Sequence, residues 1–292
     1  MEIPTFENKK ELYNWLIENK DVLITAKKTE FKRADTITAN YIKENFTQKS
    51  INKKVDTENE LYRKVVINTT NFLDSHLDVH IPGLWTKTLQ ENKNILFLQE
   101  HEMEFSKLIA KGKDLQAFTE EFNWTDLGYN KVGKTEALVF DVVIKKERNP
   151  EMFNRYKNND VDNHSVGMRY VKLIMCINDE DYGAEFEAWE KYYPMISNKE
   201  VADGKGYFWA VTEAKIIEGS AVLIGSNSIT PTLPRNEIIS DLQKTYNALG
   251  NLLENFKPIK SLEIEKNEEP QNKQSPNNQN ELNEIFNKLN KL

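Results

Sequence analysis

The stretch Asn163-His-Ser-Val-Gly-Met168 opens a long run of strand-forming residues that extends over 166–177. Valine, isoleucine, leucine, methionine and tyrosine dominate this run, a composition typical of a β-strand. Because side chains alternate between the two faces of a strand, His164 and Ser165 are expected to point in opposite directions. Ser165 shares its face with Gly167, whose missing side chain leaves space beside the hydroxyl. Ser165 is therefore a candidate nucleophile; the alternative is a strand-start serine that only bonds a nearby amide.

The composition limits the classes of protein to which the chain can belong. Its net charge of −7 over 292 residues argues against a nucleic-acid binder, which needs basic groups for phosphate contacts. The single cysteine, Cys176, allows no disulfide within the chain, which is typical of a reducing compartment. The first 19 residues are too polar for a secretory signal, and no apolar run approaches the roughly 18 residues of a membrane span. We expect a soluble intracellular protein without a nucleic-acid or membrane partner.

Short strand and helix patterns outside the central run predict an α+β fold. A short strand is expected near the N-terminus and a longer amphipathic helix after the last strand. The expected strands are 21–26, 61–69, 94–99, 118–127, 137–144, 166–177 and three pieces over 207–224, and the expected helices are 9–18, 84–91, 150–158, 185–193 and 236–256.

Composition divides the chain into three parts. Residues 1–60 read as a helical and polar extension, and residues 61–257 as the main domain. Residues 258–292 read as a polar linker followed by a short amphipathic helix. Because 266–279 contains no apolar residue, it is expected to be flexible. The terminal helix is too short to be stable alone in water and is expected to need a partner surface.

Two residues far from Ser165 in sequence could complete a catalytic site. His101 follows a predicted strand, and strand ends often carry catalytic groups. Glu218 lies between apolar strand pieces, where a charge is costly unless it is paired. A carboxylate that orients a histidine base is the third member of a catalytic triad. The alternative for Glu218 is a surface glutamate before a glycine bulge, and Ser220 is a weaker alternative nucleophile.

A metal site is the other chemical candidate. His76, Asp78 and His80 follow one another at a two-residue spacing, which would place three ligands on one face of a strand. Their segment is rich in turn residues, however, and lacks a cysteine or HExxH companion. This pattern leaves a metal-dependent hydrolase as an alternative function.

Four short motifs occur in a fixed order between residues 64 and 231. They are Asp78-Val79 with Pro82-Gly83, His101-Glu102, Ser165-Val166-Gly167-Met168, and Glu218-Gly219-Ser220-Ala221-Val222 followed by Asn227 and Pro231. Together they resemble the motifs of the tailed-phage prohead (capsid maturation) proteases, serine proteases whose fold is related to the herpesvirus assemblins. The chain departs from the pattern after Gly83, where Leu84-Trp85 stands in place of the usual Ala-Phe.

The resemblance implies a fold and a set of catalytic residues. The fold would be an assemblin-like β-barrel core of about seven mostly antiparallel strands surrounded by helices, and residues 61–257 would form the protease domain. Ser165 would be the nucleophile, His101 the general base and Glu218 the group that orients the base. Backbone amides near Val166-Gly167, or Arg169, are expected to stabilise the oxyanion. No cofactor and no metal are implied.

The resemblance also implies a biological role. The enzyme would cleave scaffold and the scaffolding segment of the capsid protein in the host cytoplasm, inside the assembling procapsid. The polar linker and terminal helix would then tether it to scaffold or shell, and a homodimer remains open. The alternative is a catalytically inactive scaffolding or assembly protein on the same fold, with the terminal helix as its working part.

Overall fold

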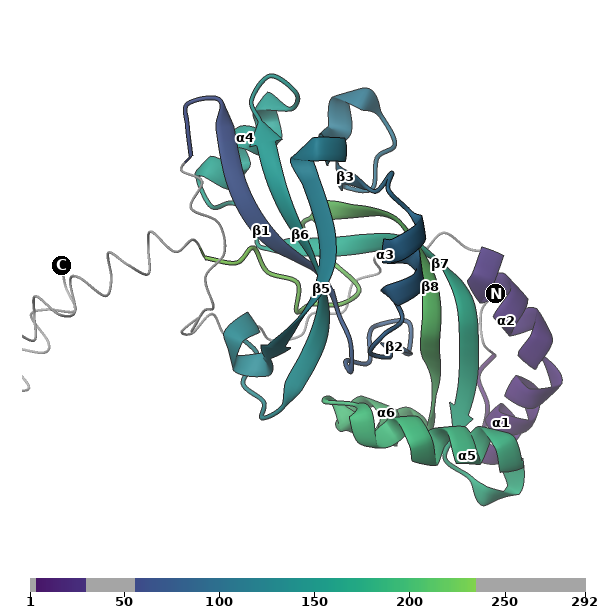
Figure 1. Ribbon diagram of the computed structural model, residues 1–292. Coiled ribbons are helices and arrows are strands. Elements are labelled where there is room, and N and C mark those ends of the chain that lie inside the picture. Colours follow the sequence, from purple (N-terminus) through teal and green to yellow (C-terminus); the bar gives the residue numbers. More distant parts are fainter. Residues whose placement is uncertain (1–3, 30–55, 235–292) are drawn as a thin grey trace, which may run out of the picture. The chain divides into compact units, whose positions relative to one another are not determined.

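The computed structural model describes residues 4–29 and 56–234, and these ranges form a mixed α+β structure (Figure 1). They contain six α-helices and eight strands. The helices are α1 (Lys9–Glu18), α2 (Lys20–Thr29), α3 (Thr86–Glu91), α4 (Pro150–Lys157), α5 (Gly183–Tyr192) and α6 (Lys199–Lys205). The strands are β1 (Glu60–Thr69), β2 (Asp78–His80), β3 (Leu96–Gln99), β4 (Leu108–Lys111), β5 (Leu115–Asn123), β6 (Lys134–Lys145), β7 (Asn163–Ile177) and β8 (Tyr207–Val222).

The described strands pair in two sheets. β1, β6 and β5 form an antiparallel sheet in that order, and the second sheet has the order β2-β8-β3-β4 with β7 also paired to β8. Residues 218–221 of β8 pair with β3 in parallel and with β7 in antiparallel register, so β3 and β7 occupy opposite edges of β8. β8 is therefore the central strand of the second sheet (Figure 1).

The two sheets pack against each other through one face of β8. A Cβ atom added at Gly219 would lie 2.5 Å from Phe140 Cε2 of β6 and 3.0 Å from Ile67 Cδ1 of β1. Phe97 of β3 packs edge-on against Phe140 with ring centroids 6.0 Å apart. Protein interiors have few voids, so a side chain at Gly219 has no free space to occupy. The glycine lets β8 approach the first sheet closely.

We predict that Gly219→Ala destabilises the protein by about 1–3 kcal/mol, because the added methyl group would overlap the Phe140 ring. The free energy of unfolding from urea titration measures the change. Gly204→Ala in α6 is the matched control: a Cβ there meets no atom within 4 Å, and alanine favours a helix. Equal stability of Gly219→Ala and wild type would contradict the packing of the two sheets.

The N-terminal helices pack on the second sheet. Tyr13 and Leu16 of α1 and Leu23 of α2 belong to the main hydrophobic core. Lys27, one helical turn after Leu23, places its Nζ 2.5 Å from Oδ1 of the fully buried Asp78. The strand expected over 21–26 is therefore wrong: a four-residue spacing, rather than alternation, directs Leu23 and Lys27 to the same side.

The fold class and most elements agree with the sequence, with differences in extent. β8 is one strand of 16 residues where three pieces are expected, and β7 begins at Asn163 rather than at 166. The predicted helix 236–256, the linker and the terminal helix lie outside the described residues. Within the described residues, none of the helices combines the length and apolar character needed to cross a membrane.

Candidate active site

Three strand ends converge on the residues that the sequence singles out. β3 and β8 are parallel and β7 is antiparallel to them, so the ends of β3 and β8 lie beside the start of β7. His101 follows β3 by two residues, and Glu218 lies near the end of β8. Ser165 is directly opposite Ser220 of β8 in the β7–β8 register. The structure thus brings Ser165, His101 and Glu218 into one region.

His101 and Glu218 form a buried hydrogen-bonded pair. Nδ1 of His101 lies 2.6 Å from Oε1 of Glu218, and the two residues are 4 % and 0 % exposed. Burial of a carboxylate is costly unless its oxygens are hydrogen-bonded. The interpretation of Glu218 as a surface glutamate is therefore wrong, and its expected pairing with a histidine is observed.

A left-handed turn after β3 brings the His101 side chain into contact with Glu218 of β8. Glu100 and His101 have φ angles of 53° and 59°, in the left-handed region that residues other than glycine rarely adopt. The Glu100 amide donates to the Ala221 carbonyl at 2.9 Å, and the His101 amide donates to Ser220 Oγ at 3.2 Å. Such backbone costs about 1–3 kcal/mol per residue and persists only where its surroundings enforce it. These two hydrogen bonds to β8 hold the turn in its left-handed conformation.

The fully buried Ser220 joins the His101–Glu218 pair. Its Oγ donates to Oε2 of Glu218 at 2.6 Å and accepts from the His101 amide. A hydroxyl has one proton to donate, and here that proton is committed to the carboxylate. Ser220 is therefore a buried hydrogen-bonding partner within the site. The two-residue spacing of Glu218 and Ser220, which puts them on one strand face, is the sequence signal for this contact.

Ser165 lies across from Ser220 on the next strand and is 6 % exposed. Gly167 lies opposite Glu218, so no side chain from β7 comes between Ser165 and the buried pair. Nε2 of His101, on the other side of the ring from Glu218, is buried and has no hydrogen-bond partner among the described residues. A hydrogen bond between Ser165 and His101 is thus not formed in this structure.

His164 points away from Ser165, as strand alternation predicts, and holds other parts of the fold together. Its Nδ1 is 2.8 Å from the Thr230 carbonyl oxygen, and its Nε2 is 2.8 Å from the Tyr156 hydroxyl. Because a carbonyl only accepts, Nδ1 carries the proton and Nε2 accepts from Tyr156. Burial lowers the pKa of His164 to about 4, although its bond to Thr230 opposes the shift. His164 is a neutral structural residue.

We predict that His164 makes stability fall as the pH drops from about 6.5 to 4. The unfolded chain takes up a proton near pH 6.5, whereas the folded imidazole stays neutral until about pH 4. Stability is thus complete above pH 6.5 and declines below it, by about 3 kcal/mol at pH 4. Urea unfolding of wild type and His164→Gln at pH 7, 6 and 5 measures the difference. Identical pH slopes for the two proteins would contradict this prediction.

The alternative metal site does not assemble. Asp78 is bound by Lys27 and accepts a hydrogen bond from the Tyr170 hydroxyl at 2.7 Å. Nδ1 of His80 is engaged by the Asn68 side chain, and burial lowers the pKa of His80 to about 4. A lysine ammonium on Asp78 opposes binding of a second cation there. In the part of the chain that the structure describes, no group of three possible ligands gathers.

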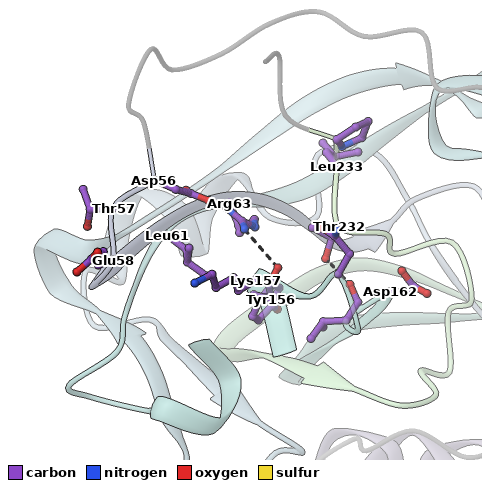
Figure 2. Close-up of a pocket in the computed structure, with 13 residues that line it drawn as sticks. Asp56, Thr57, Glu58, Leu61, Arg63, Tyr156, Lys157, Asp162, Thr232 and Leu233 are labelled. Carbon is purple, nitrogen blue, oxygen red and sulfur yellow. Dashed lines mark hydrogen bonds and ion pairs between the residues drawn. The ribbon is translucent and has the colours of Figure 1, made fainter. Parts of the chain in front are cut away.

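A cavity of about 810 Å³ is lined by 13 residues, among them Arg63, Tyr156 and Thr232 (Figure 2). None of Ser165, His101 and Glu218 lines it. Figure 2 shows Arg63 directed toward the Tyr156 carbonyl, to which it donates at 3.3 Å. Tyr156 links the cavity wall to His164 through its hydroxyl group. The residues that line the cavity are thus a different set from the candidate catalytic residues.

Comparison of the chain with known protein families, with curated proteins and with solved structures finds no match. The features that bear on function are therefore the geometry of the site and the order of the sequence motifs.

Proposed function

We propose that the chain is a serine endopeptidase in which Ser165 is the nucleophile, His101 the general base and Glu218 the group that orients the base. The observation that carries this proposal is the buried hydrogen bond between His101 Nδ1 and Glu218, beside a serine on the neighbouring strand. Nucleophile, base and orienting group in this order are what acyl transfer requires.

The arrangement supports a definite sequence of proton transfers. Glu218 accepts a hydrogen bond from the protonated Nδ1 of His101, so the lone pair of the neutral imidazole is on Nε2. Nε2 takes the proton of Ser165 as the serine oxygen bonds to the scissile carbonyl carbon, and then gives it to the leaving amine. Water hydrolyses the resulting ester by the same exchange in reverse. This mechanism needs one movement, which brings Ser165 Oγ within hydrogen-bond distance of His101 Nε2.

The oxyanion donors in this proposal are backbone amides near Val166 and Gly167, or the Arg169 side chain. Arg169 is exposed and lies four residues beyond Ser165 on β7, on the same strand face by alternation. Removal of one oxyanion donor typically slows such enzymes about 100- to 1,000-fold.

The motif order supports a more specific identity, the prohead maturation proteases. In this proposal the two sheets belong to an assemblin-like barrel, and the substrates are scaffold and the scaffolding segment of the capsid protein, cleaved inside the assembling shell. Four of the six strand pairings are antiparallel, as that fold expects. The tether at 258–292 lies outside the described residues and stays part of the proposal.

We predict that a fluorophosphonate probe labels Ser165 and that Ser165→Ala abolishes labelling. Glu218→Gln should slow labelling by about 100-fold or more, because the amide no longer supplies a negative charge to His101. Mass spectrometry identifies the labelled residue, and the time course gives the rate. Glu213→Gln is the matched control, since this β8 carboxylate contacts only lysine side chains among the described residues.

Absence of labelling in a folded wild-type protein would contradict the proposed protease activity. It would favour the alternative, a catalytically inactive assembly protein on the same fold. Equal rates for Glu218→Gln and wild type would instead remove Glu218 from the mechanism.

The surface around the site favours a polypeptide substrate. Seven large apolar side chains are exposed among the described residues, and four of them follow His101 or the end of β8 by a few positions. These four, which we call the apolar rim, are Met103, Phe105, Leu223 and Ile224. Exposed apolar groups beside a site often belong to a binding surface, and these four lie in the segments that follow the strand ends of the site. In this proposal the rim contacts apolar side chains of the peptide.

We predict that Phe105→Ser raises the KM for protein substrates several-fold and leaves fluorophosphonate labelling unchanged, because the probe is too small to need the rim. Phe105 is 92 % exposed, so its replacement removes no core contact. Val132→Ser is the control, because Val132 is equally exposed but lies in the β5–β6 connection, outside the rim. Equal KM values for Phe105→Ser and Val132→Ser would exclude the rim from substrate binding.

A further inference from the structure

Ser220 closes a ring of hydrogen bonds around the candidate base. His101 Nδ1 bonds Oε1 of Glu218 at 2.6 Å, and Oε2 of the same carboxylate accepts from Ser220 Oγ at 2.6 Å. Ser220 Oγ in turn accepts from the His101 main-chain amide at 3.2 Å. The ring therefore connects the side chain of His101 to its own backbone through two residues of β8.

We infer that Ser220 is a positioning residue of the proposed hydrolytic site, one that fixes the Glu218 carboxylate and the left-handed turn at His101 together. This inference rests on the proposed function. A glutamate side chain has three rotatable bonds, and a single contact to His101 would leave its second oxygen buried without a partner. The Ser220 hydroxyl supplies that partner and selects one carboxylate orientation.

The same hydroxyl also acts on the main chain. The φ of 59° at His101 is unfavourable for a residue with a Cβ, and the buried amide of His101 in this turn donates to Ser220 Oγ. Without that acceptor the turn loses a contact that opposes its relaxation. The imidazole of His101 is attached to this turn, so its orientation, and with it the direction of Nε2, depends on Ser220. In the proposed mechanism Ser220 itself contacts neither the Ser165 proton nor the substrate.

The test compares fluorophosphonate labelling of full-length wild type, Ser220→Ala and Ser220→Thr over a range of probe concentrations. Ser220→Ala should lower the maximal labelling rate by about 10- to 100-fold, the effect expected for one hydrogen bond to a charged group, and leave the half-saturating probe concentration unchanged. Ser220→Thr retains the hydroxyl and should recover most of the rate. Ser228→Ala is the control, because Ser228 Oγ is also buried but has no hydrogen-bond partner among the described residues.

Each outcome bears on a distinct claim. A labelling rate of Ser220→Ala equal to wild type, or a Ser220→Thr variant as slow as Ser220→Ala, would overturn the positioning role and leave the protease proposal standing. An adduct on Ser220 in place of Ser165 would also overturn it. A wild-type protein that is not labelled at all would reject the proposed function itself. A thermal melt of each variant shows that the fold is intact.

Discussion

The architecture around β8 depends on one requirement, that the buried Glu218 carboxylate be fully hydrogen-bonded. A carboxylate with no exposed surface is stable in a protein only if both oxygens have donors. The donors come from His101 and Ser220, one on each side of the carboxylate. These two hydrogen bonds join the turn after β3 to one face of β8, and they leave His101 Nε2 without a hydrogen-bond partner among the described residues.

β8 serves two purposes through alternation of its side chains. Glu218 and Ser220 face the site, whereas Gly219 between them faces Phe140 and Ile67 of the first sheet. Because the core-side residue is a glycine, the first sheet lies close enough to support the strand from behind. His164 of β7 pairs with Ala221 of β8 and lies on the same core-side face, where it hydrogen-bonds with Tyr156 and Thr230. The candidate site thus stands on a tightly packed layer, which restricts the movement of its groups.

Part of this arrangement could be predicted from sequence because it follows from local rules. The two-residue period of a strand predicts that His164 and Ser165 point in opposite directions, and the cost of a buried charge indicates a partner for Glu218. Two features could not be predicted from the sequence. The parallel pairing of β3 with β8 joins residues far apart in the chain, and the left-handed turn at Glu100 and His101 contains no glycine that would indicate it. The short apolar run at 21–26 fits the period of a strand as well as that of a helix, so the pattern alone does not predict the helix Lys20–Thr29.

A crystal structure of the protein after reaction with a fluorophosphonate would show whether Ser165, His101 and Glu218 act together as proposed. We expect phosphorus bonded to Ser165 Oγ, His101 Nε2 within hydrogen-bond reach of the adduct, and the Nδ1–Glu218 contact retained at its present 2.6 Å. A His101 ring turned away from the phosphorylated serine, or phosphorus on another residue, would contradict this proposal.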